Sequence, residues 1–171
     1  HAVLIEAVAR LNRPDVVCLL VGAVGDRTRY RDQLLALAAK RGLGARLLLV
    51  DHCDDMPAAY MLADVVVSAS TQPESFGRIV TEAQAMGRPV VVSNHGGAPE
   101  QIRIGVTGWV STPGDPDALA QALAAALALD SEARKRLSVE ANAHVRANYS
   151  LERMCALTRA VYDELAPRRG A

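Results

Sequence analysis

The sequence predicts an α/β fold in which a parallel sheet is wound with helices on both faces. Short apolar runs rich in valine, at 65–70 and 90–92, are typical of strands buried on both sides. Longer segments with helical periodicity alternate with these runs, which favours strand–helix–strand units. Half of the 171 residues are hydrophobic, so the chain can bury the core of one compact domain.

The amino-terminal third alternates helices with two strands. Val3, Ala7 and Leu11 recur on one helical face, and no capping residue precedes them. We therefore expect the beginning of the domain to be missing. Gly42 ends the next helix. The elements expected here are a helix at 1–11, a strand at 16–21 that leads to Gly22, a helix at 29–41, a strand at 46–50 and a short helix that ends at Leu62.

The middle of the chain places a strand, a turn and a helix in close succession. Gly77 permits a tight turn into the helix, and Gly87 with Pro89 ends it. The elements expected here are a strand at 65–70, a loop at 71–76, a helix at 78–86, a strand at 90–92, a turn or short helix at 98–102 and a strand at 108–110.

Three helices are expected at the carboxyl-terminal end. Asp115 is placed to cap the first of them, with Pro116 at its first position. Ser150 is placed to cap the last one, so residues 150–165 are expected to form a C-terminal helix together with its N-cap residue. The expected ranges are 115–129, 131–148 and 151–165.

The candidate binding residues lie in the loops that follow the expected strands. Ligands of such sheets bind outside the carboxyl ends of the strands. The segment after the strand at 65–70 places Glu74 and Glu82 around a Phe-Gly turn that opens a helix. Backbone N–H groups at Gly77–Val80 point out of that helix start, where anions bind. We therefore expect a phosphate or diphosphate site, built from the loops after Gly22, Val50, Ser70 and Ser93.

The motif in this segment resembles that of a known family. PESFG (73–77) is followed by Glu82, with seven residues between the two glutamates, and then by Gly87-x-Pro89-Val-Val and Gly96-Gly97-x-x-Glu100. This pattern closely resembles the donor-binding half of retaining glycosyltransferases of family 4. The resemblance extends over essentially the whole chain and implies the Rossmann-like, C-terminal half of a GT-B glycosyltransferase.

The resemblance implies a role for each matching residue. Donor-sugar hydroxyls would bind Glu74 and the backbone of Ser75, Phe76 and Gly77. Glu82 would accept hydrogen bonds from the ribose hydroxyls, as a carboxylate can from a vicinal diol. No residue is given the role of catalytic base or nucleophile. The diphosphate would bind Gly22, Arg78, Ile79 and Val80, and the loop of Asp51, His52 and Cys53 would lie on the side of the base.

Some residues leave alternatives open. The family usually has an aliphatic residue where Arg78 stands, so Arg78 is either an extra phosphate contact or a surface partner of Glu82, the second being favoured. His95 either touches the ligand or is a satisfied turn histidine. The Gly22–Gly25 segment lacks the third glycine of a dinucleotide fingerprint. The histidine, cysteine and aspartates at 51–55 have no second cluster to complete a metal shell, so no metal is predicted.

Composition excludes several classes of partner. The formal net charge is zero, which disfavours a nucleic-acid footprint or a polybasic membrane patch. The sequence has neither a long uninterrupted apolar stretch nor a signal-peptide pattern. Three widely spaced cysteines suit free thiols in a reducing compartment. These features predict a cytoplasmic protein. Peripheral association of the full-length enzyme with the inner membrane is not encoded in this chain and stays open.

The sequence therefore predicts the donor domain of an enzyme that transfers a sugar from a nucleotide diphosphate sugar with retention. The partners expected are the nucleotide-sugar donor and a missing N-terminal acceptor domain. In the resembled family, a strand and a loop before the first helix supply an Arg and a Lys to the diphosphate, so the resemblance implies that the chain alone is inactive. The alternatives are a sugar-nucleotide epimerase of the same architecture and a non-catalytic nucleotide-binding or interaction module.

Overall fold

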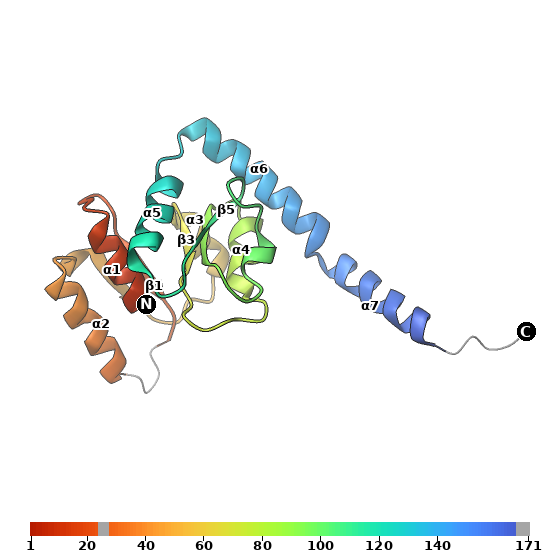
Figure 1. Cartoon of the computed structure of the whole chain (residues 1–171), viewed down its shortest axis with the longest axis horizontal. Helices are drawn as coiled ribbons and strands as arrows, with labels where there is room; N and C mark the ends of the chain where they lie inside the picture. The colour runs from red at the N-terminus through yellow and green to blue at the C-terminus, as the bar shows by residue number, and fades with distance from the viewer. Residues whose placement is uncertain (24–27, 167–171) are drawn as a thin grey trace, which may run out of the picture.

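The computed structural model describes residues 1–23 and 28–166. Helices and strands alternate along most of the chain, as expected (Figure 1). The strand pairs within these ranges are all parallel. The elements are, in order, α1 (Ala2–Arg10), β1 (Cys18–Val21), α2 (Thr28–Lys40), the 3₁₀ helix η1 (Gly44–Arg46), β2 (Leu47–Val50), α3 (Met56–Leu62), β3 (Val66–Ser68), α4 (Arg78–Ala85), β4 (Val90–Ser93), the 3₁₀ helix η2 (Pro99–Gln101), β5 (Gly108–Ser111), α5 (Pro116–Leu127), α6 (Ser131–Asn148) and α7 (Leu151–Leu165).

The strands form two parallel sheets. β1 pairs with β2, with Cys18 opposite Leu47, and the second sheet has the order β3-β4-β5, with Val90 between Val66 and Gly108. The expected parallel strands between layers of helices are therefore confirmed, but they are divided into two sheets. No strand among residues 1–23 and 28–166 joins β1 to β3, so each of these two strands keeps one unpaired edge.

One hydrophobic core nevertheless joins the two sheets. Buried residues of α1 and α5, such as Ile5 and Leu119, pack in the same cluster as Cys18 of the first sheet and Val91 of the second. A second cluster lies on the other face of β3-β4-β5. It contains Tyr60 of α3 with residues of α4 and β4. Helices thus cover both faces, as the sequence predicts.

Strand β4 shows how the sequence pattern builds these two layers. Val90 and Val92 belong to the cluster formed with α3 and α4, whereas Val91 belongs to the cluster formed with α1 and α5. Successive side chains of a strand point to opposite faces, and both faces of β4 are buried. An unbroken valine run is therefore the expected sequence for this strand.

The predicted helix caps are confirmed. Asp115 accepts hydrogen bonds from the backbone N–H groups of Asp117 and Ala118, and Pro116 is the first residue of α5. Ser150 accepts from Arg153 N–H at 3.2 Å. The boundaries of the elements lie within two residues of the expected ones, and the strand expected at 65–70 narrows to β3. Arg46 belongs to η1 rather than to β2.

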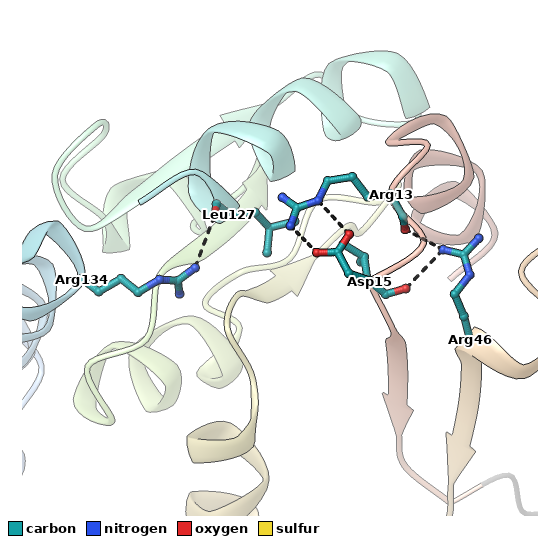
Figure 2. Close-up of polar contacts among 6 residues, drawn as sticks. Arg13, Asp15, Arg46, Leu127 and Arg134 are labelled. Atoms are coloured by element: carbon teal, nitrogen blue, oxygen red, sulfur yellow. Dashed lines mark hydrogen bonds and ion pairs between the residues drawn. The ribbon is translucent and has the colours of Figure 1, made fainter. Parts of the chain in front are cut away.

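At the end of the sheets where the strands begin, arginine side chains donate hydrogen bonds to neighbouring elements (Figure 2). Arg46 donates to the backbone oxygens of Arg13 and Val16, at 2.8 and 3.3 Å, and so fixes the turn between α1 and β1. Arg13 forms an ion pair with Asp15. Arg134 of α6 donates to the Leu127 carbonyl at the end of α5. This end is opposite to the loops that follow the strands.

Helices α6 and α7 differ in how they pack. α6 packs along α4, where Asn142 donates to the Ala85 carbonyl at 2.8 Å and a Cβ on Gly87 would collide with Ser138. α7 extends away from the rest of the molecule and has no buried residue (Figure 1). Its exposed apolar side chains are Leu151, Met154, Leu157, Val161, Tyr162 and Leu165. None of the helices within the described ranges is both long and apolar enough to span a membrane.

Candidate functional site

The loops that follow the strands meet in two pairs. Gly22, directly after β1, donates its N–H to the carbonyl of Val50 at the end of β2, at 3.0 Å. Gly22 is exposed, and its φ of +154° is a conformation that other residues rarely adopt. Residues 24–27, which include Gly25 of the Gly22–Gly25 segment, lie outside the described residues.

The loop after β3 is clamped to the loop after β4. Gly97 donates its N–H to the Glu74 carbonyl at 2.8 Å, and Nε2 of His95 lies 3.0 Å from the carbonyl oxygen of Ser70. A Cβ on Gly96 or Gly97 would collide with the backbone of Glu74 or Ser75. The two glycines therefore allow a backbone-to-backbone contact that holds the 71–77 segment in place. Since a carbonyl only accepts, Nε2 of His95 is the donor.

Glu74 and Gly77 shape the start of α4. A Cβ on Gly77 would lie 2.9 Å from Oε2 of Glu74, so this carboxylate lies over the glycine. Gly77 is the N-cap of α4 with a φ of +71°, and no side chain caps the helix. Within the described ranges, the N–H groups of Arg78 and Ile79 have no hydrogen-bond partner. The helix therefore presents donors to solvent beside an exposed carboxylate.

Val80, which was expected among the diphosphate-binding residues, has its backbone N–H engaged within the helix. Its backbone N–H donates to the carbonyl of Gly77 at 3.3 Å. This bond closes the first turn of α4. The donors at this helix start that are free for an anion are therefore those of Arg78 and Ile79.

Glu82 has two side-chain partners. Tyr60 donates its hydroxyl to Oε2 at 2.8 Å, and Nε of Arg78 lies 3.4 Å from Oε1. The Glu82 side chain is 38% exposed, while Arg78 is 84% exposed. The surface pair considered for Arg78 is therefore present. Burial, together with the hydrogen bond to Glu82 and its charge, raises the pKa of Tyr60 well above its usual value.

Sequence reasoning missed Tyr60. It is separated from Glu82 by 22 positions and belongs to another helix. The signal available was limited to an aromatic residue on the helix that follows the loop at the carboxyl end of β2. That position alone does not tell whether its hydroxyl reaches the site.

In the loop of Asp51, His52 and Cys53, the histidine and the cysteine have hydrogen-bond partners within the loop. His52 pairs with Asp54 at 2.9 Å, and the Cys53 thiol donates to the Asp55 carbonyl at 3.4 Å. Asp51 and His52 are exposed at the end of β2. In the part of the chain that the structure describes, no cluster of three histidine, cysteine or acidic side chains is arranged to hold a metal ion.

Phe76 and Glu100 both contact the junction between α6 and α7. The Phe76 ring meets the Tyr149 ring edge-on, with centroids 5.8 Å apart. The Tyr149 hydroxyl donates to the backbone carbonyl of Glu100 at 2.9 Å. Glu100 lies in η2, where a turn or short helix was predicted. The Phe76 side chain thus anchors the loop and leaves its backbone beside the helix start.

A separate cavity of about 620 Å³ lies between β5, α6 and the turn before β5. Arg103, Trp109 and Glu140 are among its lining residues, and none of the candidate site residues lines it. It therefore takes no part in the site.

Sequence comparisons identify related proteins. A model of the family described as glycosyl transferases group 1 matches residues 1–144. The chain is 36% identical over 141 residues to a D-inositol 3-phosphate glycosyltransferase of Mycolicibacterium gilvum. The matched region covers 81% of this chain and 31% of that protein. A protein of the same name from Salinispora tropica is 36% identical over 171 residues. That match covers 95% of this chain and 35% of the relative. The chain thus spans about a third of the length of these relatives.

Solved structures agree with this result. A glycosyltransferase from Rickettsia africae superposes with a TM-score of 0.88 at 32% identity, covering 95% of this chain and 43% of that one. HepE from Anabaena in complex with UDP gives a TM-score of 0.87 at 29% identity, covering 95% and 44%. HepE is also known in complex with UDP-glucose. The fold of this chain is therefore found in the glycosyltransferases that it resembles.

Proposed function

The chain belongs to the glycosyl transferases group 1, and from this membership we propose that it forms the donor-binding part of an enzyme that transfers a sugar from a nucleotide diphosphate sugar to an acceptor. The start of α4 carries this proposal. There, within the described ranges, the N–H groups of Arg78 and Ile79 have no hydrogen-bond partner, and Glu74 precedes them and Glu82 follows them in the sequence. Such a helix start favours an anion, and a diphosphate fits it.

Glu82 is placed to bind the ribose of a nucleotide diphosphate sugar, and Glu74 is placed to bind its sugar. Glu82 lies one turn into α4, half exposed, where its carboxylate can accept hydrogen bonds from the two ribose hydroxyls. Glu74, over Gly77, can accept from hydroxyls of the sugar. The loop of Asp51, His52 and Cys53 is assigned to the side of the base, and Gly22 to the diphosphate. No metal is assigned to this domain.

Related proteins support the class of donor. UDP and UDP-glucose are bound by HepE of Anabaena, which shares the fold of this chain. The motif around Glu74 and Glu82 resembles that of the retaining family 4, so we assign retention at the anomeric carbon. Neither carboxylate is assigned as a base or nucleophile. Helix-start donors would favour departure of the diphosphate because negative charge develops on it during transfer.

The break between the two sheets suggests how the domain is completed. β1 and β3 each have one edge without a strand partner among residues 1–23 and 28–166, yet α1 and α5 share a core with both sheets. We assign to the gap between β1 and β3 a parallel strand from outside the chain. With that strand in the centre, the two sheets would become one sheet with the strand order of a doubly wound fold. The relatives are about three times longer, which leaves room for this strand and for an acceptor domain.

A titration tests the donor site. The 171-residue chain is titrated with UDP, GDP, ADP and their sugar conjugates, and the titration is repeated with Glu82→Ala. We expect one nucleotide to be preferred, and its Kd to rise about 10-fold or more in the variant, since a charged hydrogen-bond acceptor is lost. Glu132→Ala is the matched control, because Glu132 is an equally charged, exposed residue paired with Lys135 on α6.

Two outcomes would overturn the proposal. One is a nucleotide affinity that Glu82→Ala leaves unchanged. The other is a full-length protein that binds no nucleoside diphosphate. Product analysis of the full-length enzyme then separates transfer, which gives a glycosylated acceptor and free nucleoside diphosphate, from epimerisation of the donor. The chain alone is expected to transfer no sugar, and acceptor glycosylation by it would contradict that expectation.

A further inference from the structure

Tyr60 joins the core of the domain to the carboxylate of Glu82. Its side chain is 5% exposed and belongs to the cluster that contains Val80 and Ala83, which flank Glu82 on α4. Its hydroxyl donates to Oε2 of Glu82 at 2.8 Å. A ring packed in this way cannot shift without disturbing its neighbours, so the core fixes the position of the hydroxyl.

The other partner of Glu82 is a weaker constraint. Nε of Arg78 lies 3.4 Å from Oε1, and the arginine side chain is 84% exposed. Exposed ion pairs of this kind contribute little, because solvent screens them and a long side chain must be ordered. The orientation of the Glu82 carboxylate therefore depends mainly on Tyr60.

The contact leaves Glu82 able to bind a ligand. An ionised carboxylate offers about four acceptor positions, and Tyr60 occupies one of them. The Glu82 side chain remains 38% exposed, so the acceptor positions that face neither Tyr60 nor Arg78 are open to an incoming diol. The hydroxyl of Tyr60 stays protonated, and thus a donor, because burial and the neighbouring carboxylate raise its pKa.

Helix α3 anchors the tyrosine at the edge of the site. Asp55 caps α3 by accepting the Ala58 N–H at 3.0 Å, and it lies two positions after Cys53 of the loop assigned to the side of the base. The same short helix thus connects this loop to the Glu82 carboxylate.

We propose that Tyr60 is a positioning residue that holds the Glu82 carboxylate in the orientation that accepts the ribose hydroxyls of the nucleotide. The proposal rests on the proposed function, since it deepens the assignment of Glu82 to the ribose. It predicts that loss of one hydroxyl, without loss of the ring, weakens binding only for nucleotides that carry the ribose diol.

The test compares UDP with 2′,3′-dideoxyuridine diphosphate on the wild-type chain and on Tyr60→Phe. Phenylalanine retains the buried ring, and a thermal melt checks that the fold is kept. We expect the Kd for UDP to rise about 3- to 10-fold in the variant, the effect of one hydrogen bond, and the Kd for the dideoxy analogue to stay the same. Tyr162→Phe on α7, where the tyrosine is 71% exposed, is the matched control and should change neither Kd.

A double variant completes the test. If Tyr60 acts through Glu82, Tyr60→Phe adds no further loss of UDP affinity to Glu82→Ala. An equal loss for UDP and the dideoxy analogue, or additive losses in the double variant, would overturn the proposal in favour of a structural role. A Glu82→Ala variant that binds UDP as the wild type does would refute the donor-site assignment itself, which distinguishes the two failures.

Discussion

Gly97 donates its backbone N–H to the carbonyl oxygen of Glu74 at 2.8 Å, and this bond joins the loops that follow β4 and β3. The contact is possible because Gly96 and Gly97 have no Cβ atoms, which would collide with the backbone of Glu74 and Ser75. The position of the Glu74 carboxylate therefore depends on the loop after the next strand.

Gly97→Ala is expected to displace the loop that contains Glu74. The added Cβ meets backbone rather than a flexible side chain, so the loops must separate. We expect a loss of about 1–3 kcal/mol in the free energy of unfolding and weaker binding of nucleotide sugar. Urea unfolding and titration measure the two effects.

The control for this variant is Gly105→Ala. Gly105 has a φ of +77° and open space around its Cα, so the substitution adds backbone strain without a collision. It should cost stability but leave nucleotide-sugar affinity intact. If Gly97→Ala binds as tightly as the wild type, the clamp between the loops is not needed for the site.

Ending the chain at Ser150 is expected to leave the domain folded. No residue of α7 is buried, so its removal exposes little of the core. We expect Tm to change by less than about 2 °C, since surface changes rarely exceed 0.5 kcal/mol. Leu137→Ala on α6 is the contrasting variant, because Leu137 is 4% exposed and its truncation should cost about 2–5 kcal/mol. A Tm loss for the truncated chain as large as that of Leu137→Ala would show that α7 stabilises the domain.

The three thiols should differ in reactivity. Cys155 is exposed, Cys53 is partly exposed and Cys18 is buried in the core. Burial raises the pKa of the Cys18 thiol to about 11, so it remains neutral and inaccessible at pH 8. A colorimetric thiol assay at that pH should label Cys155 and Cys53 readily and Cys18 only after denaturation. Rapid reaction of all three thiols in the folded chain would contradict this.

The same thiol predicts a pH dependence of stability. Its pKa in the folded chain, about 11, lies above the value of roughly 8.5 expected for an unfolded chain. The contribution of the neutral thiol is complete below the unfolded value and is lost as the pH rises towards 11. Stability measured by urea unfolding should therefore fall over this range, and less so in Cys18→Ala, which has no thiol to titrate.

Local features of the fold were predictable from the sequence, whereas contacts between distant residues were not. The caps of α5 and α7 depend on Asp115 and Ser150 and their immediate neighbours, so a short window of sequence contains all the information. The order of the strands depends on pairing between segments far apart in the sequence, and such pairing is not encoded in the apolar runs themselves.

The candidate site shows the same division. The turn at Gly77 and the pair of Arg78 with Glu82 follow from spacing along one helix. The bond from Tyr60 to Glu82 joins two helices, and the contact of Gly97 with Glu74 joins two loops. These contacts arise only when the sheet brings the ends of its strands together.

Arg78 offers a direct test of how the start of α4 binds an anion. Its guanidinium pairs with Glu82 at 3.4 Å and is 84% exposed, so we expect a surface pair rather than a phosphate contact. Arg78→Leu should then change the free energy of unfolding by less than about 0.5 kcal/mol. Its Kd for UDP should match that of the wild type within about 2-fold, because the backbone N–H groups remain. Comparison with uridine isolates the phosphate contribution: a loss confined to UDP would identify Arg78 as a phosphate ligand, and the surface-pair interpretation would then be wrong.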